Sequence, residues 1–161
     1  MEASQRYVIE TKRDQYAGHN CFLASLRCIL DHCGCRYSET QLFFISNSLK
    51  IRYGNDLNEI GRYTVDGLNE FSKKTLATVT TLRRDAGEMI PEKMLKMLKS
   101  GMIMLDVDTK CLNYNKLYTE NENRKHLIVL YGIDINEKTA HVMDLYMLDY
   151  KENVTVYRGK I

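Results

Sequence analysis

Apolar residues recur at helical spacing in the first half of the chain. They form one stripe over residues 21–32, with Asn20 in front as a helix cap and Gly34 behind as a terminating residue. Ser38 followed by Gln41 matches a capping box, which indicates the start of another helix that runs to about Leu49. A third helix is predicted over 65–74, so the first half of the chain is expected to be helical.

The second half contains shorter runs of apolar and β-branched residues, which are typical of strands. Pro91 suits the first turn of one intervening helix, expected to end near Ser100. Residues 136–138 match a turn, so the runs on either side of them are expected to pair as a hairpin. The predicted extended segments are 7–10, 76–82, 102–107, 126–134, 140–144 and 153–158.

Helices followed by an antiparallel sheet predict an α+β fold. The chain has 161 residues, enough for a substantial core, so we expect a single domain over 1–161. A helical N-terminal lobe would pack on the sheet. The N-terminus of the helix over 21–32 would then lie beside strand residues from the second half.

Composition and charge narrow the class of protein. Apolar residues make up 44% of the chain and charged residues 27%, which is ordinary for a globular protein. We expect a bacterial cytoplasmic protein without a membrane segment, because no apolar run has the length of a span and residues 1–13 lack a secretory signal. The five cysteines are then expected to be thiols. A net charge of +2 is too small to indicate nucleic-acid binding.

Cys21 is the candidate nucleophile because it is predicted to begin a helix. At a helix N-terminus, unpaired backbone N–H groups and the helix dipole stabilise a thiolate. Gln15 lies six residues earlier, where its side-chain amide and the Cys21 N–H could together bind an oxyanion. His19 and Asn20 are adjacent and are candidate substrate-binding residues. A free cysteine is more often a small buried apolar residue, so the case for Cys21 depends on its partners.

His126 and Asp144 are the candidate base and its orienting carboxylate. His126 begins the most apolar predicted strand after a polar loop, a setting in which an imidazole can take a thiol proton. Asp144 is predicted to end the paired strand, where it could accept the ring N–H and fix the tautomer. Asp134 and Asp149 are alternatives for this role. A structural histidine and a turn-capping aspartate are the competing interpretation.

The other four cysteines have weaker claims to a function. Cys28 falls on the apolar stripe of its helix, which indicates packing. Cys33 and Cys35 lie close to a histidine, but no second pair of ligands at zinc-site spacing follows, so we expect no metal site. Cys111 is expected in a loop without an obvious base.

In residues 19–21, 24–27, 29–31, 34 and 38–39 the sequence resembles the N-terminal half of the butirosin-type acyltransferases, which are papain-fold enzymes of bacterial natural-product pathways. The hairpin with His126 also resembles that of the C39 peptidases, which trim double-glycine leaders, as does the six-residue step from Gln15 to Cys21. A compact chain of this kind is similar, in addition, to the cysteine-protease-like amide synthase of closthioamide assembly. The later stretches that carry the butirosin-type resemblance are 95–98, 101, 107–108, 112–114, 126–134 and 142–144.

The resemblance implies a papain-like α+β fold with Cys21 as nucleophile, His126 as base, Asp144 as its orienter and Gln15 as oxyanion donor. The expected reaction moves an acyl group from a carrier-protein thioester through Cys21 to a small-molecule amine, forming an amide. No cofactor is expected other than the phosphopantetheine of an acyl or peptidyl carrier protein, which would be the partner. A C39-like peptidase and a catalytically silent carrier-binding module remain as alternatives.

Overall fold

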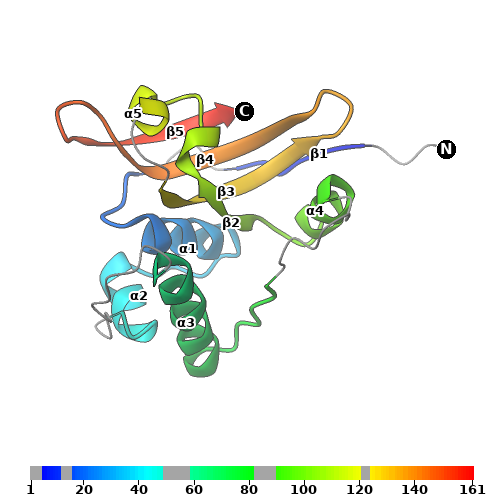
Figure 1. Ribbon diagram of the computed structural model, residues 1–161. Coiled ribbons are helices and arrows are strands. Elements are labelled where there is room, and N and C mark those ends of the chain that lie inside the picture. The colour runs from blue at the N-terminus through cyan, green and yellow to red at the C-terminus, as the bar shows by residue number, and fades with distance from the viewer. Residues whose placement is uncertain (1–4, 12–15, 49–58, 82–89, 121–123) are drawn as a thin grey trace.

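The computed structural model describes residues 5–11, 16–48, 59–81, 90–120 and 124–161. It is an α+β structure in which helices of the first half pack on an antiparallel sheet, as the sequence predicts (Figure 1). The helices are α1 (Cys21–His32), α2 (Glu39–Ile45), α3 (Glu59–Lys74), α4 (Ile90–Leu98) and α5 (Lys116–Glu120), with a 3-10 turn, η1 (Thr109–Cys111). The strands are β1 (Arg6–Val8), β2 (Ile103–Asp108), β3 (Lys125–Asp134), β4 (Thr139–Leu148) and β5 (Val154–Lys160).

The sheet is built around β3, which is the most fully buried of the described strands. β4 pairs with one edge of β3, and β5 pairs with the far edge of β4. β1 and β2 both pair with the other edge of β3. β2 pairs with the first half of β3, from Lys125 to Leu130, and β1 pairs with its end, from Gly132 to Asp134. The first residues of β3, where the site lies, are therefore paired with β2.

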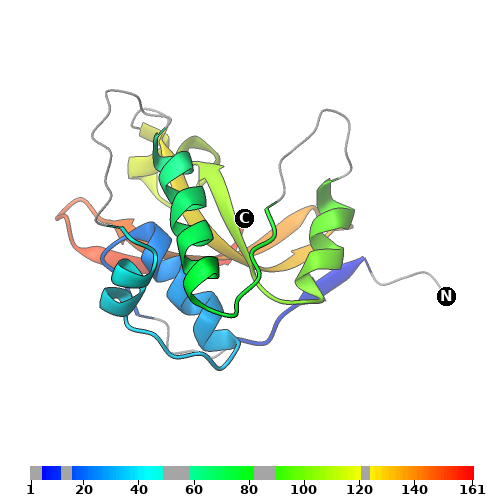
Figure 2. The same cartoon turned by 90° about the horizontal axis from the view of Figure 1, so that it is seen from below.

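Helix α1 lies between the sheet and the other two N-terminal helices, and Figure 2 shows all three in front of the strands. One side of α1, with Ala24 and Cys28, belongs to the apolar core of the sheet. Another side, with Phe22 and Leu26, packs with apolar residues of α2 and α3, including Phe71. Burial on two sides explains why this helix carries so wide an apolar stripe.

Both ends of α1 follow the predicted capping chemistry. Asn20 caps the N-terminus with its side-chain oxygen. At the other end Gly34 has a φ of +82°, a left-handed conformation that glycine adopts without strain. The Gly34 N–H bonds to the Asp31 carbonyl and the Cys35 N–H to the Leu30 carbonyl, which is a Schellman motif. The predicted capping box of α2 is also present, between Ser38 and Gln41.

Several predicted boundaries were wrong. The run 76–81 forms no strand, because Leu76 is fully exposed and none of the described strands pairs with it; residue 82 lies outside the described residues. Helix α2 ends at Ile45 instead of continuing to Leu49, and α3 begins six residues before the predicted start at 65. Helix α5 occupies part of what was expected to be a polar loop. No helix among the described residues has both the length and the apolar character needed to cross a membrane.

Candidate active site

Cys21 is the first residue of α1, and the cap in front of it is well defined. The Asn20 Oδ1 accepts the backbone N–H groups of Phe22 and Leu23 at 2.9 and 3.2 Å, and the Asn20 carbonyl accepts the N–H of Ala24 at 2.9 Å. The Cys21 N–H takes part in none of these three bonds. The Cys21 side chain is half-buried, so its sulfur lies at the positive end of the helix with partial access to solvent.

Two hydrogen bonds tie the start of α1 to the strands that carry His126 and Asp144. The Ser25 hydroxyl, which is fully buried, donates to the Leu127 carbonyl at 3.4 Å. The Gly18 N–H donates to the Leu145 carbonyl at 2.8 Å. Each acceptor comes directly after a candidate site residue, so these two bonds set where Cys21 lies relative to β3 and β4.

The segment before Cys21 is fixed by a group that we call the Glu39 clasp, formed by Tyr16, His19, Arg27 and Glu39. One Glu39 oxygen lies 2.7 Å from the Arg27 guanidinium, and the other accepts the His19 backbone N–H at 2.8 Å. Arg27 also donates to the Tyr16 carbonyl at 2.7 Å. A Cβ at Gly18 would overlap with Ala24 and lie 2.5 Å from Glu39, so this approach requires glycine.

His126 lies near the start of β3 and is bonded to Asp144 on β4. The distance from His126 Nε2 to Asp144 Oδ1 is 2.9 Å, and Cys21 lies close enough to the imidazole to help raise its pKa. The sheet register explains the first contact. Val129 pairs with Met143, so Asp144 lies across from Ile128, which is two residues after His126. Alternate residues of a strand face the same side of a sheet, so Asp144 and His126 share one face. Three residues that are far apart in sequence are thus brought together.

The Asp144 carboxylate is fully buried and receives four hydrogen bonds. Oδ1 accepts His126 Nε2 and, at 3.1 Å, the Tyr146 backbone N–H. Oδ2 accepts the hydroxyls of Tyr114 and Tyr118 at 3.0 and 2.9 Å. A buried charge is tolerated only where such partners replace water, and here every partner is a neutral donor or the imidazole.

Asp144 does not end its strand, contrary to the prediction. β4 continues to Leu148, but its register with β5 shifts by one residue between Asp144 and Met147. The Tyr146 N–H in this irregular stretch bonds to the Asp144 side chain. Irregularities of this kind are common beside functional sites, where they redirect a side chain.

Burial and hydrogen bonding shift the pKa of His126 in opposite directions. Burial of the ring opposes protonation, but the hydrogen bonds to Asp144 and Cys21 and the charges of both groups prevail, and they raise the pKa of His126 from 6.5 to about 9. Burial and the nearby Asp144 carboxylate raise the pKa of Tyr114 and of Tyr118, so both hydroxyls stay protonated and act as donors. The geometry therefore favours an imidazolium beside Cys21 at neutral pH.

The remaining predicted residues have other surroundings. Gln15 lies outside the described residues. The His19 side chain is 95% exposed, with Nδ1 3.5 Å from a Glu39 oxygen. Asp134 lies at the far end of β3, 3.7 Å from Arg6, and Asp149 accepts N–H groups of its own turn. Among the carboxylates of the described residues, Asp144 is the one bonded to His126.

The other four cysteines have surroundings different from those of Cys21. Cys28 is buried in the core, as expected, and burial followed by the charge of Asp31 raises its pKa to about 12. Cys33, Cys35 and Cys111 are exposed free thiols. Within the described ranges, no group of three histidine, cysteine or acidic side chains is arranged to hold a metal ion.

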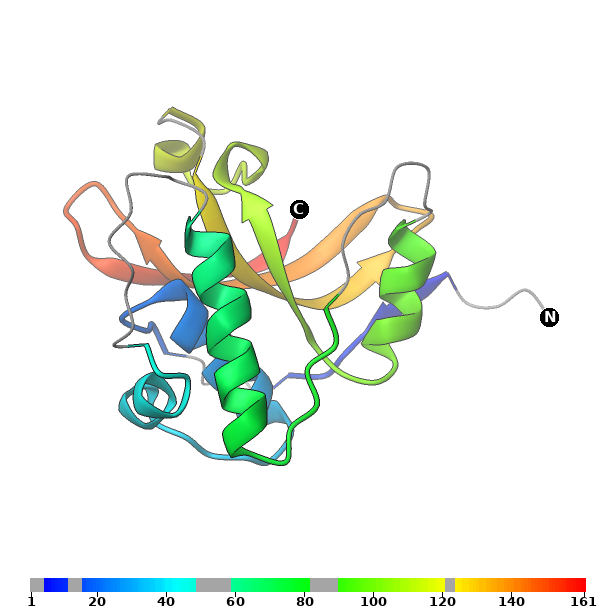
Figure 3. The ribbon, with the colours of Figure 1, turned by 60° about the horizontal axis from the view of Figure 1, so that its bottom comes forward.

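Tyr114 and Tyr118 were not identified from the sequence as site residues. They precede β3 and flank the start of α5, which Figure 3 shows together with η1 beyond the end of β2. The available signal was Asn115, whose side chain accepts the Leu117 N–H and whose carbonyl accepts the Tyr118 N–H. Such a cap marks a helix start within a polar stretch and would have placed Tyr118 in a turn of helix.

A comparison with protein-family models matches residues 20–145 to the family described as butirosin biosynthesis protein H, N-terminal. The match begins at the cap of α1 and ends one residue after Asp144, so it covers Cys21, His126 and Asp144. Neither the comparison with curated proteins nor the comparison with solved structures found a match.

Proposed function

Because the chain belongs to the family of the butirosin biosynthesis protein H N-terminal domain, we propose that it is an acyltransferase that forms an amide through Cys21. Members of this family are acyltransferases of butirosin biosynthesis and have a papain-like fold, and membership suggests an enzyme of antibiotic biosynthesis. The observation that carries the proposal is the position of His126, which is hydrogen-bonded to Asp144 and lies close enough to Cys21 for that side chain to help raise its pKa.

The resting state is a thiolate–imidazolium pair. Asp144 binds Nε2 of His126, so we assign the other ring nitrogen, Nδ1, to Cys21. The raised pKa of His126, about 9, keeps the ring protonated at neutral pH, and the N-terminus of α1 stabilises the thiolate. Cys21 is then a nucleophile before any substrate arrives.

In the first half-reaction the Cys21 thiolate attacks the carbonyl carbon of a thioester on the phosphopantetheine arm of a carrier protein. The bond between carbonyl carbon and carrier sulfur breaks, and the leaving thiolate takes a proton from the His126 imidazolium. The products are an acyl-Cys21 thioester, a free carrier thiol and neutral His126. The Cys21 N–H, which lies outside the three capping bonds, and the Gln15 amide are our candidates for binding the oxyanion.

In the second half-reaction an amine attacks the acyl-Cys21 carbonyl. Neutral His126 accepts the proton that the amine nitrogen loses, and the carbon–sulfur bond breaks to release the Cys21 thiolate and the amide. This restores the original ion pair. Acylation removes the Cys21 charge that helps to raise the pKa of His126, so the neutral ring that this step needs is favoured in the acyl-enzyme.

The test uses an acyl-loaded carrier protein, or a short acyl thioester of N-acetylcysteamine, incubated with the protein with and without a diamine. Intact mass spectrometry is expected to show an acyl adduct confined to Cys21 and an amide that forms only when the diamine is present. Cys21→Ala should abolish both. Cys33→Ala is the matched control, because it removes an exposed thiol at the other end of α1 and should change neither.

Hydrolysis is the second candidate, because a cysteine, histidine and aspartate in this arrangement also serve the C39-like peptidases that share the fold. Free acid released at the same rate with and without the diamine would favour it over transfer. A carrier-binding module without catalysis would give no acyl adduct at all. Either result would overturn the proposed amide-forming reaction.

A further inference from the structure

Two tyrosines that belong to neither α1 nor the two site strands complete the hydrogen bonding of Asp144. We propose that Tyr114 and Tyr118 are positioning residues of the site, which act through Asp144 to fix the tautomer and the basicity of His126. This inference rests on the proposed function, since it matters only if His126 exchanges protons with Cys21 and substrate.

The first step is that the two oxygens of Asp144 bind different partners. Both tyrosine hydroxyls donate to Oδ2, at 3.0 Å from Tyr114 and 2.9 Å from Tyr118. This leaves Oδ1 for His126 Nε2, at 2.9 Å, together with one backbone N–H. A carboxylate without donors on Oδ2 could turn and offer either oxygen to the ring. The two hydroxyls therefore hold the oxygen that binds His126 in one place.

The second step concerns the tautomer of His126. The Tyr118 oxygen lies 3.2 Å from Nε2, and its ring is 5.3 Å from the imidazole at an angle of 51°. Because the Tyr118 proton goes to Asp144, its oxygen can only accept from Nε2. Both neighbours of Nε2 are then acceptors, which keeps the proton on that nitrogen. Nδ1 is left with a lone pair towards Cys21 whenever the ring is neutral.

The third step is the rigidity of the tyrosines. Tyr114 stacks on Tyr157 of β5 with ring centres 3.8 Å apart and an angle of 3° between the planes. It also meets the edge of Tyr118 at 6.1 Å. Tyr114 therefore packs between Tyr157 of the edge strand β5 and Tyr118 of α5, and Tyr118 in turn contacts Asp144 and His126. A stacked, partly buried pair has little rotational freedom, as a positioning element requires.

The expected effect on His126 follows from charge. When the ring is neutral, Asp144 is a buried anion that depends on its other donors for stabilisation. When the ring is protonated, the imidazolium supplies part of that stabilisation. Removing a tyrosine donor thus destabilises the state with a neutral ring more than the state with a protonated ring, so the pKa of His126 should rise. The second half-reaction, which needs the neutral ring, should then require a higher pH.

The experiment compares Tyr118→Phe, Tyr114→Phe and the double variant with the wild type. Each substitution keeps the ring and removes one hydroxyl. The first readout is the titration of His126 by NMR of its ring carbon, expected to shift upward by roughly half to one pH unit in Tyr114→Phe. The upward shift in Tyr118→Phe should be smaller, because this change also removes an acceptor of the Nε2–H. The second is the rate of Cys21 alkylation by iodoacetamide as a function of pH. The change in this rate that accompanies deprotonation of His126 should move to higher pH by the same number of units as the NMR titration. The third is the amide-forming rate at pH 7, expected to fall more than the rate of acyl-Cys21 formation.

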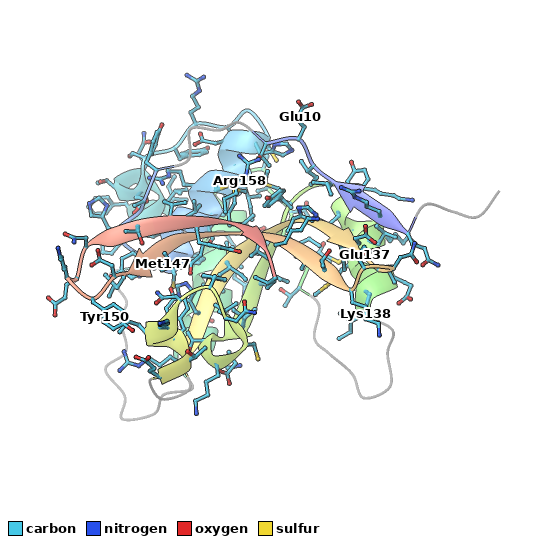
Figure 4. All side chains as sticks on the ribbon, turned by 90° about the horizontal axis from the view of Figure 1, so that it is seen from above. Glu10, Glu137, Lys138, Met147, Tyr150 and Arg158 are labelled. Carbon is cyan, nitrogen blue, oxygen red and sulfur yellow. The ribbon has the colours of Figure 1, made fainter. Side chains whose placement is uncertain are left out.

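Tyr150→Phe is the matched control. Tyr150 lies beside α5 at the tip of the β4–β5 hairpin (Figure 4), and its exposed hydroxyl donates to Glu120 at 3.2 Å, away from Asp144. It should leave all three readouts unchanged. Circular dichroism and thermal unfolding establish that each variant is folded, and Tyr114→Phe, which does not touch His126, carries the test if Tyr118→Phe is unstable.

Two different failures can be told apart. If wild-type Cys21 is not alkylated selectively, or if His126→Ala leaves that alkylation unchanged, the proposed function is overturned. If wild-type alkylation depends on His126 but the folded tyrosine variants titrate like the wild type, the role of the tyrosines alone is overturned.

Discussion

The backbone N–H of Gly18 donates to the carbonyl of Leu145 at 2.8 Å, one residue after Asp144. This bond joins the segment that leads into Cys21 directly to the strand that orients His126. It is a backbone bond, so it depends on the close approach of these two segments more than on any particular side chain. The residues that allow the approach are small ones, Gly18 and Ala24.

Gly18→Ala should therefore move Cys21 away from His126. The new methyl group would overlap with Ala24 and with Glu39, and relief of such overlap in a packed region typically costs about 1–3 kcal/mol. We expect a lower midpoint of urea unfolding and slower iodoacetamide labelling of Cys21 in the molecules that remain folded. Gly34→Ala, at the other end of α1, should lower stability through its positive φ without slowing the labelling. Equal labelling rates in the two variants would contradict the prediction.

Glu39→Gln should loosen the segment before Cys21. The Arg27 and Glu39 side chains are only 12% and 9% exposed, so removing one charge leaves the other partly buried without its partner. The free energy of unfolding is expected to fall by about 3 kcal/mol. Glu70→Gln, which removes the carboxylate from a more exposed pair with Lys73 on α3, should have a much smaller effect. Chemical denaturation of both variants measures the difference.

Asp144→Asn should reduce acyl transfer more than substrate binding. Burial lowers the pKa of His126 and the carboxylate opposes this effect, so removing the carboxylate lowers the pKa and weakens the imidazolium as counter-ion of Cys21. An asparagine can also present its amide N–H to Nε2, which favours the wrong tautomer. We expect the turnover rate to fall roughly 10²-fold with little change in KM. A turnover rate within a factor of two of the wild type would argue against Asp144 as the orienter.

The stability of the protein should fall on the alkaline side of neutrality. The pKa of His126 is about 9 in the folded state, above its ordinary value of 6.5, so the folded protein binds the proton more tightly than the unfolded chain. The resulting stabilisation is complete below pH 6.5 and disappears as the pH rises through 9, with a total on the order of 3 kcal/mol. Urea unfolding at pH 6 and pH 10 measures it.

The control for this pH dependence is His126→Gln, which removes the titrating group and keeps a polar side chain. Its stability should change less between pH 6 and pH 10 than that of the wild type. Parallel curves for the two proteins would mean that His126 does not titrate with a raised pKa in the folded state.

The sequence was sufficient where local chemistry and tertiary packing agree. The apolar stripe, Asn20 and Gly34 define α1 without reference to the rest of the chain, and both of its predicted ends are confirmed. The strand that begins near His126 and the turn that follows it are confirmed for the same reason. Periodicity can predict a face of a helix or strand, because burial of that face is what stabilises it.

Tertiary partners decided the remaining features. The run 76–81 has the composition of a strand, but a strand needs a neighbour to bond with, and none of the described strands pairs with it. Helix α5 has only five residues, too few to be stable alone, and it is held through Tyr118 and Asn115 by contacts to Asp144 and Leu148. The expected role of Gln15 stays a prediction, because that residue lies outside the described ranges.

The glycine-terminated end of α1 offers a practical route to observing a partner protein. Cys33 and Cys35 are exposed there, about 18 Å along the helix axis from Cys21. A fluorophore attached to Cys33 in a Cys21→Ser, Cys35→Ser, Cys111→Ser background would be fixed to one end of α1, with the reaction centre at the other end. Energy transfer to a dye on an acyl-loaded carrier protein would then report docking as a distance, without requiring turnover.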